Sequence, residues 1–261
     1  MEKIKVIENA KVVLERGIIW DGVIVISGER IAAFGKRAEV DIPDGAEHID
    51  ANGAYVGPGF VDIHVHGGGG YSTCYNPVEA SEFFLKTGTT TLLATPDYHM
   101  NLEELLNVIR IIKENMGKAR TIRGIYMEAP YTNPDFGSHS YANPWRQGVI
   151  EEEYRQFVDA GGELVKVWTV AAERKDLVPF LQYARKVNPD VRFAVGHSNA
   201  TPAEIRALGT KYRPTIETHS MNATHTQPVP GGTRGYGPDE YCFKDEDVFL
   251  RAYFRLSRCS R

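Results

Sequence analysis

The chain has 261 residues, and its 30 Lys and Arg against 34 Asp and Glu give a formal net charge of −4. Hydrophobic residues make up 42% and charged residues 25%, which excludes a disordered or collagen-like chain. The weak negative charge argues against a nucleic-acid partner or an anionic membrane surface, and no apolar run reaches the roughly 18 residues that a membrane span needs.

The chain is expected to work in a reducing compartment. Its opening segment, MEKIKVIENAKVVLE, lacks the uninterrupted apolar stretch of a signal peptide. Its cysteines, Cys74, Cys242 and Cys259, are few and widely spaced, which does not indicate a disulfide framework. We therefore expect a cytoplasmic protein.

Residues 1–57 predict a small β element. β-branched residues gather in short runs, and Gly17, Gly28 and Gly35 separate these runs as turn residues do. The runs span residues 5–9, 11–14, 22–27 and 30–35.

Short apolar runs alternate with helical stretches from Pro58 to about residue 249. This alternation predicts a parallel sheet with right-handed crossovers, and runs that are apolar throughout indicate strands buried on both faces. A (β/α) barrel and a doubly wound sheet both fit this pattern. The expected strands are 59–66, 89–95, 121–128, 164–171, 192–197 and 215–219. The expected helices are 77–87, 102–116, 150–160, 177–187 and 202–208.

Metal-ligating side chains stand at the carboxyl ends of four of these runs. Residues i and i+2 of a strand share a face, and all strand ends of a barrel open onto one mouth. Imidazole and carboxylate are ligands of zinc and iron(II), and a catalytic ion keeps one position open for water. The pattern therefore predicts a site for one or two divalent ions. The expected ligands are His64, His66, Glu128, His197 and His219.

Two further residues have more than one interpretation. Lys166 lies within the fourth run, where a buried lysine can be carbamylated and bridge two metals, but a plain lysine pointing away from the site is the simpler interpretation. His139 lies on the loop after the third run, and a surface position and a position near a substrate carbonyl are equally open.

Four motifs resemble those of the amidohydrolase superfamily and, within it, the N-acetylglucosamine-6-phosphate deacetylase family. The motifs are PGFVDIHVHG at 58–67, Glu-Ala-Pro at 128–130, GHSNAT at 196–201 and THSMNA at 218–223. GHSNAT is the most specific of them, whereas the His-x-His strand occurs across the superfamily. The resemblance covers about residues 1–249.

This resemblance implies an α/β fold, a metal-dependent (β/α)8 TIM-type barrel over 58–249 with residues 1–57 as half of a small β-sandwich domain. The implied reaction is hydrolysis of N-acetylglucosamine 6-phosphate to glucosamine 6-phosphate and acetate. Glu128, His197 and His219 match the family's metal ligands, and His64 and His66 match the pair that forms a second metal position in some members. The matched substrate-binding residues are His139, Asn222, Ala223 and Arg234.

The chain departs from the family in its length and in its last segment. We count about six strands where a barrel of this type needs eight. The family's general acid, an Asp after the eighth strand, has no counterpart, because Asp239, Asp245 and Asp247 lie in what we expect to be an exposed acidic loop. Residues 250–261, LRAYFRLSRCSR, form an atypical basic tail. We therefore expect a C-terminally truncated, inactive or weakly active form, with no catalytic residue identified.

Alternatives remain open at this point. The substrate class is a small N-acetylated amino-sugar phosphate, but a dihydroorotase-like or N-acyl-amino-acid hydrolase using Lys166 is a second interpretation. A third is a non-catalytic metal-binding fragment, since the exposed edges of an incomplete barrel favour a homo-oligomer.

Overall fold

The computed structural model describes residues 3–136, 141, 143–225 and 235–252. Contacts within the chain divide it into two units, residues 1–60 and 61–261. In the described part of the chain, no helix is both long enough and apolar enough to cross a bilayer.

The first unit is one mixed β-sheet built around its first strand. β1 (Ile4–Leu14) pairs antiparallel with β2 (Gly17–Ser27), which pairs antiparallel with β3 (Arg30–Lys36). β4 (Glu47–Asp50) and β5 (Tyr55–Val56) both pair in parallel with β1. The two runs expected within 5–14 form a single strand, because the break at Asn9, whose φ is 53°, is only a bulge in the ladder.

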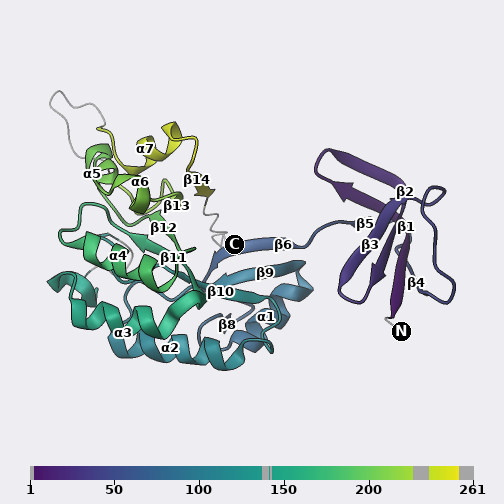
Figure 1. Cartoon of the computed structure of the whole chain (residues 1–261), viewed down its shortest axis with the longest axis horizontal. Helices are drawn as coiled ribbons and strands as arrows, with labels where there is room; N and C mark the ends of the chain where they lie inside the picture. The colour runs from purple at the N-terminus through teal and green to yellow at the C-terminus, as the bar shows by residue number, and fades with distance from the viewer. Residues whose placement is uncertain (1–2, 137–140, 142, 226–234, 253–261) are drawn as a thin grey trace, which may run out of the picture. The chain divides into compact units, whose positions relative to one another are not determined.

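The second unit is a curled parallel sheet, a partial barrel, in the order β14-β13-β12-β11-β10-β9-β6 (Figure 1). Its strands from β9 to β14 pair in parallel. The strand bounds are β6 (Phe60–Val65), β9 (Thr89–Ala94), β10 (Ile122–Met127), β11 (Val165–Val170), β12 (Arg192–Val195), β13 (Ile216–Ser220) and β14 (Phe249–Ala252). A short hairpin of β7 (Gly67–Gly68) and β8 (Tyr71–Ser72) follows β6.

Helices connect these strands as crossovers, and the long ones cover one face of the sheet (Figure 1). The large core lies between this face and the helices and includes Leu105, Phe157, Trp168 and Phe180. A smaller core fills the concave face, with Leu93, Tyr126, Val167, Ala194 and Ile216. The helices are α1 (Pro77–Lys86), α2 (Leu102–Asn115), α3 (Glu151–Gly161), α4 (Leu177–Val187), α5 (Pro202–Ala207), α6 (Gly209–Tyr212) and α7 (Pro238–Lys244). Two 3-10 turns are η2 (Pro144–Gln147) and η3 (Gly162–Leu164).

Besides the short β7–β8 hairpin and α6, the sequence missed one strand and one helix of this unit. β14 pairs in parallel with β13 through Phe249 and Leu250, so the sheet has seven strands and not six, and the boundary expected at residue 250 falls inside a strand. Strand pairing depends on the free backbone edge of the neighbour, which residue composition does not report. The helix is α7, which replaces the acidic loop expected around Asp239.

Candidate metal centre

Five side chains from four strands meet at the carboxyl ends of the sheet. His64 lies in β6 and His66 directly after it, Glu128 directly follows β10, His197 follows β12, and His219 lies in β13. All except His66 are buried, with at most 6% of each residue exposed. These are the five ligands expected from the sequence, and the structure brings them together in two groups that could hold a metal ion, both containing Glu128.

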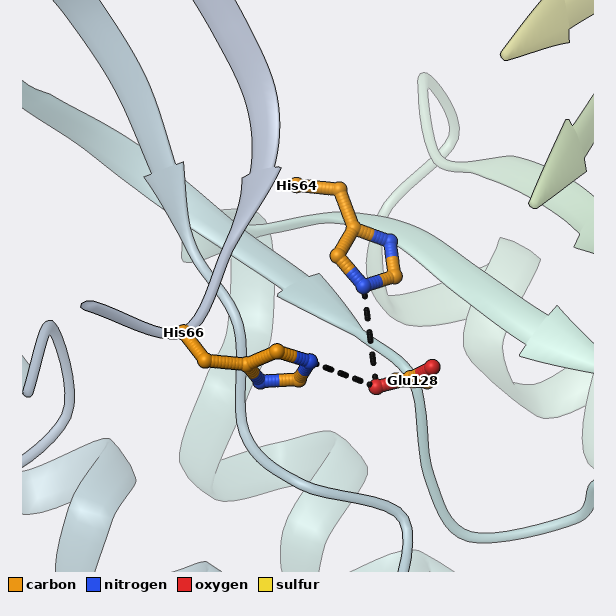
Figure 2. Close-up of side chains that lie close together, drawn as sticks. All are labelled: His64, His66 and Glu128. Atoms are coloured by element: carbon orange, nitrogen blue, oxygen red, sulfur yellow. Dashed lines mark ion pairs between the residues drawn. The ribbon is translucent and has the colours of Figure 1, made fainter. Parts of the chain in front are cut away.

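Glu128 stands between two pairs of imidazoles. Its Oε1 lies 2.8 Å from His197 Nε2 and 2.9 Å from His219 Nε2. Its Oε2 lies 3.0 Å from His66 Nε2 and 3.6 Å from His64 Nε2, and Figure 2 shows both of these rings directed at the one oxygen. Each carboxylate oxygen therefore serves a different histidine pair, as a carboxylate bridging two ion positions would.

The tautomers of two rings are fixed by backbone carbonyls. His219 Nδ1 lies 3.0 Å from the carbonyl of Asn222, and His66 Nδ1 lies 3.0 Å from the carbonyl of Thr95. A carbonyl only accepts, so each Nδ1 carries the hydrogen and, in a neutral ring, each Nε2 presents its lone pair to Glu128. A lone pair that faces a carboxylate oxygen needs a cation or a proton between them. The donor set therefore fits a divalent metal, and the second hydrogen bond is the one that metal-bound histidines usually make.

The same cluster sets the protonation of its members. Burial opposes ionisation of Glu128, yet its interactions with His197, His219, His64 and His66 favour the charged carboxylate and hold its pKa well below the usual range. Burial lowers the pKa of His66, but Glu128 outweighs it and the net shift is upward. Glu128 is therefore ionised at neutral pH and provides the negative charge that a metal ion needs.

Two of the expected ligands have a left-handed backbone conformation. The φ angle is 46° at His197 and 37° at His219. Non-glycine residues rarely adopt this region, and where they do the neighbouring structure must hold them there. Both turns come where a buried strand surfaces, so the strain is placed at the rings that face Glu128.

A second layer of polar groups lies beneath and beside the rings. Tyr126 packs its ring against His64, with centroids 4.7 Å apart, and its hydroxyl lies 2.7 Å from Thr218 Oγ1. Tyr98, which is buried, packs on His197 with centroids also 4.7 Å apart. Tyr126 thus connects β6 to the strand that carries His219.

The other expected site residues have different outcomes. Asn222 is exposed and Ala223 half-buried on the loop that follows His219. Lys166 is exposed and belongs to neither metal-ligating group found among the described residues. His139 and Arg234 lie outside the described residues.

Three acidic residues lie near the expected ligands, and no role was predicted for them from the sequence. Asp239 was expected in an exposed loop, but it lies in the first turn of α7 and is 3% exposed. Glu217 is fully buried, and burial followed by the nearby Asp239 raises its pKa to about 8. Glu173 lies between β11 and α4, where it binds the loop after His197. A Pro directly before an acidic pair, as in Gly-Pro-Asp-Glu at 237–240, is the helix-start signal that could have located Asp239.

Comparison with known proteins confirms the resemblance drawn from the motifs. No family model matches the chain. The chain is 29% identical over 236 residues to an N-acetylglucosamine-6-phosphate deacetylase of Haemophilus influenzae, covering 86% of this chain and 58% of that enzyme. It is 37% identical over 112 residues to an adenine deaminase of Kosmotoga olearia, covering 42% of this chain and 18% of that enzyme.

Solved structures agree with the sequence comparison. The N-acetyl-D-glucosamine-6-phosphate deacetylase of Mycobacterium smegmatis superposes with a TM-score of 0.77 at 26% identity, over 95% of this chain and 63% of that one. A variant of that enzyme was solved in complex with N-acetyl-D-glucosamine-6-phosphate. The chain therefore spans less than two thirds of the deacetylases it matches.

Proposed function

Because the chain is a relative of the N-acetylglucosamine-6-phosphate deacetylases, we propose that it is a metal-dependent amidohydrolase whose reaction is removal of the acetyl group from N-acetylglucosamine 6-phosphate. The products are glucosamine 6-phosphate and acetate. One observation carries the proposal, which is the placement of the Glu128 carboxylate between two pairs of imidazole nitrogens within 3.6 Å.

Zinc or iron(II) suits these ligands best, because neutral imidazole and carboxylate are the donors that both ions prefer. Glu128, His197 and His219 would hold one ion, and His64 and His66 with Glu128 a second. A divalent ion at this position supplies Lewis acidity toward the acetamide carbonyl and lowers the pKa of water to about 7.

The loop after His219 supports a small sugar phosphate as the substrate. Asn222 offers an exposed amide next to the cluster, and its backbone carbonyl orients the His219 ring. In this proposal Asn222 and the Ala223 backbone contact the phosphorylated sugar, while His139 and Arg234 remain predicted partners of the substrate carbonyl and the phosphate. An arginine suits that task because its planar fork donates two parallel hydrogen bonds to a phosphate.

The leaving amine needs a proton, and no residue that would donate this proton is identified in the described part of the site. Among the described residues, neither metal-ligating group contains a carboxylate besides Glu128. We therefore expect the 261-residue chain to bind metal firmly but to release acetate slowly. The two free, buried thiols of Cys74 and Cys242 support a reducing location, and we place the reaction in the cytoplasm.

The experiment begins with metal content. The purified chain is loaded with zinc, dialysed and assayed by elemental analysis, with Glu128→Gln beside it. We expect the parent chain to retain zinc and Glu128→Gln to lose it. Equal zinc contents in the two proteins, or no zinc in either of them, would contradict the proposed metal centre.

The substrate is then tested separately. Acetate release is measured with N-acetylglucosamine 6-phosphate and with unphosphorylated N-acetylglucosamine. Slow release that requires the phosphate supports the proposed substrate. A chain that binds zinc but releases no acetate from either sugar would support the metal-binding fragment instead.

A further inference from the structure

We propose that Glu173 and Asp239 are positioning residues that hold the loops after His197 and His219 and so keep both imidazoles on Glu128. The inference rests on the metal centre proposed above. It concerns two carboxylates that form hydrogen bonds to the loops beside two of the expected ligands.

Glu173 holds the loop after His197 from the neighbouring crossover. Its Oε2 accepts a hydrogen bond from the Ser198 hydroxyl at 2.7 Å, and its Oε1 accepts one from the Asn199 backbone N–H at 2.9 Å. Oε1 also accepts from the Asn133 side-chain amide at 2.8 Å, and the Asn133 backbone N–H donates to the His197 carbonyl at 2.8 Å. Glu173 therefore fixes the chain after His197 directly and its carbonyl through Asn133.

Asp239 does the same for His219 from α7. Its two oxygens accept from the Met221 backbone N–H at 2.9 Å and from the Thr224 hydroxyl at 2.7 Å. Between these two residues lies Asn222, whose carbonyl accepts the hydrogen of His219 Nδ1. Asp239 therefore holds the carbonyl that decides which nitrogen of His219 faces Glu128.

The two anchored loops form one unit. The Ser198 backbone N–H donates to the Ala223 carbonyl at 3.2 Å, and the His225 N–H donates to the Ser198 carbonyl at 3.1 Å. A displacement of one loop is thus transmitted to the other. This explains why both carboxylates are expected to act on the same ion position, the one formed by Glu128, His197 and His219.

The backbone conformation supplies the reason for the anchors. His197, His219, Met221 and Ala223 all have positive φ angles, 46°, 37°, 62° and 54°. Such conformations persist only where surrounding contacts over-determine them. Hydrogen bonds to an ionised acceptor are stronger than neutral ones, so a carboxylate is well suited to hold each loop. Loss of either carboxylate should allow the backbone to relax and the ring to turn away from Glu128.

The test is a cobalt(II) titration, because the visible absorption of bound cobalt reports both affinity and ligand geometry. The variants are Glu173→Ala, Glu173→Gln, Asp239→Ala and Asp239→Asn in the full chain. Glu204→Ala is the matched control for the alanine variants, since Glu204 accepts from the Thr201 backbone N–H at 2.7 Å and so holds the turn after residues 197–199. Urea unfolding without metal reports the fold.

We expect each alanine variant to bind cobalt about 10- to 100-fold more weakly and to change its absorption spectrum, as for loss of other groups that orient metal ligands. The Gln and Asn variants should recover most of the affinity, because an amide oxygen still accepts from the backbone N–H and an amide N–H can donate to the serine or threonine hydroxyl. The control should match the parent chain.

Three results would overturn the inference: an unchanged affinity and spectrum in the alanine variants, an equal loss in Glu204→Ala, or amide variants no better than alanine. If the alanine variants do not fold, Ser198→Ala and Thr224→Val decide, and unchanged cobalt affinity in both would overturn it. A parent chain that binds no cobalt rejects the metal centre itself, whereas a cobalt-binding parent with unaffected variants rejects only the positioning role.

Discussion

The Nε2 atoms of His197 and His219 lie 3.0 Å apart, and both lie within 2.9 Å of the same oxygen of Glu128. Because His219 Nδ1 donates its hydrogen to the Asn222 carbonyl, Nε2 carries a lone pair when the ring is neutral. His219 Nε2 and Glu128 Oε1 are then two electron-rich atoms 2.9 Å apart, which repel one another unless a proton or a metal ion lies between them. The spacing is what a shared cation would impose, and it makes each histidine pair separately testable.

Replacing one histidine pair should remove one ion position and leave the other. We expect the double variant His197→Asn/His219→Asn to bind less cobalt per chain than the parent. The double variant His64→Asn/His66→Asn should also bind less, because the two histidine pairs contact different oxygens of Glu128. Cobalt per chain, measured at saturation, checks this. The expectation fails if one double variant binds as much cobalt as the parent, since that pair then holds no ion.

Tyr126→Phe should destabilise the fold at the layer beneath the rings. The change keeps the ring on His64 but removes the hydroxyl that lies 2.7 Å from Thr218 Oγ1. Loss of a buried hydrogen bond costs about 1–2 kcal/mol of the free energy of unfolding, which urea titration measures.

The matched control for this change is Tyr183→Phe. The Tyr183 hydroxyl donates to Asp159 at 2.7 Å but at an exposed position. We expect its removal to change the free energy of unfolding by about 0.5 kcal/mol or less, as for most surface substitutions. Equal losses of unfolding free energy in both variants would show that the Tyr126 hydroxyl contributes no more to stability than an exposed hydroxyl does.

Gly196→Ala should disturb both stability and metal binding. A Cβ at residue 196 would lie 2.5 Å from Thr218 Cβ and 3.2 Å from Thr169 Cγ2, so the strand before His197 must shift. Overpacking of this kind costs about 1–3 kcal/mol of the free energy of unfolding. Cobalt affinity should fall with it, because His197 is the next residue.

Gly209→Ala provides the comparison. Gly209 has open space around it and a φ of +69°, so alanine there is strained by its backbone alone, which costs about 1–2 kcal/mol. We expect this variant to lose stability in urea while its cobalt affinity stays that of the parent chain. A similar drop in cobalt affinity would mean that the site responds to global stability and not to residue 196.

The thiols of Cys74 and Cys242 should resist alkylation in the native state. Burial raises the pKa of Cys74 from 9.0 to about 12, and burial also raises the pKa of Cys242. Only the thiolate reacts, so both should remain unmodified by iodoacetamide at pH 8 and react in urea, as peptide mass spectrometry would show. Rapid modification of either thiol in the native chain would contradict the burial.

The same shift fixes the sign of a stability change at high pH. The folded chain holds the Cys74 proton more tightly than the unfolded chain does. Its contribution to stability is therefore fully present below about pH 9 and is lost as the pH rises toward 12. Cys74→Ser should flatten this part of a plot of unfolding midpoint against pH.

The sequence predicted which side chains would meet at this site, because their positions follow local rules. A His-x-His spacing on a strand and single polar residues at buried strand ends are visible without the fold, and the parallel topology then requires them to meet. Asp62 lies within β6 and Asp97 shortly after β9, so residue type alone would not have separated the expected ligands from their neighbours. The match of His64, His66 and Glu128 to a recognisable motif did so.

The supporting residues could not be predicted in this way. Glu173 acts on residues 25 and 26 positions along the chain, and Asp239 on a loop 15 to 18 positions before it. Such pairings depend on how crossover loops pack against one another, which no periodicity records. β14 escaped detection for a similar reason, because its pairing with β13 depends on an available backbone edge.

A carboxylate with one oxygen for each histidine pair has a consequence for metal loading. Glu128 has a single negative charge for both ion positions. The first ion to bind neutralises this charge, so the second ion binds more weakly. Occupancy should then rise in two unequal steps as the free ion concentration increases, and the more weakly bound ion should be lost first on dilution or chelation. The number of ions bound per chain would then depend on the free metal-ion concentration in the cell.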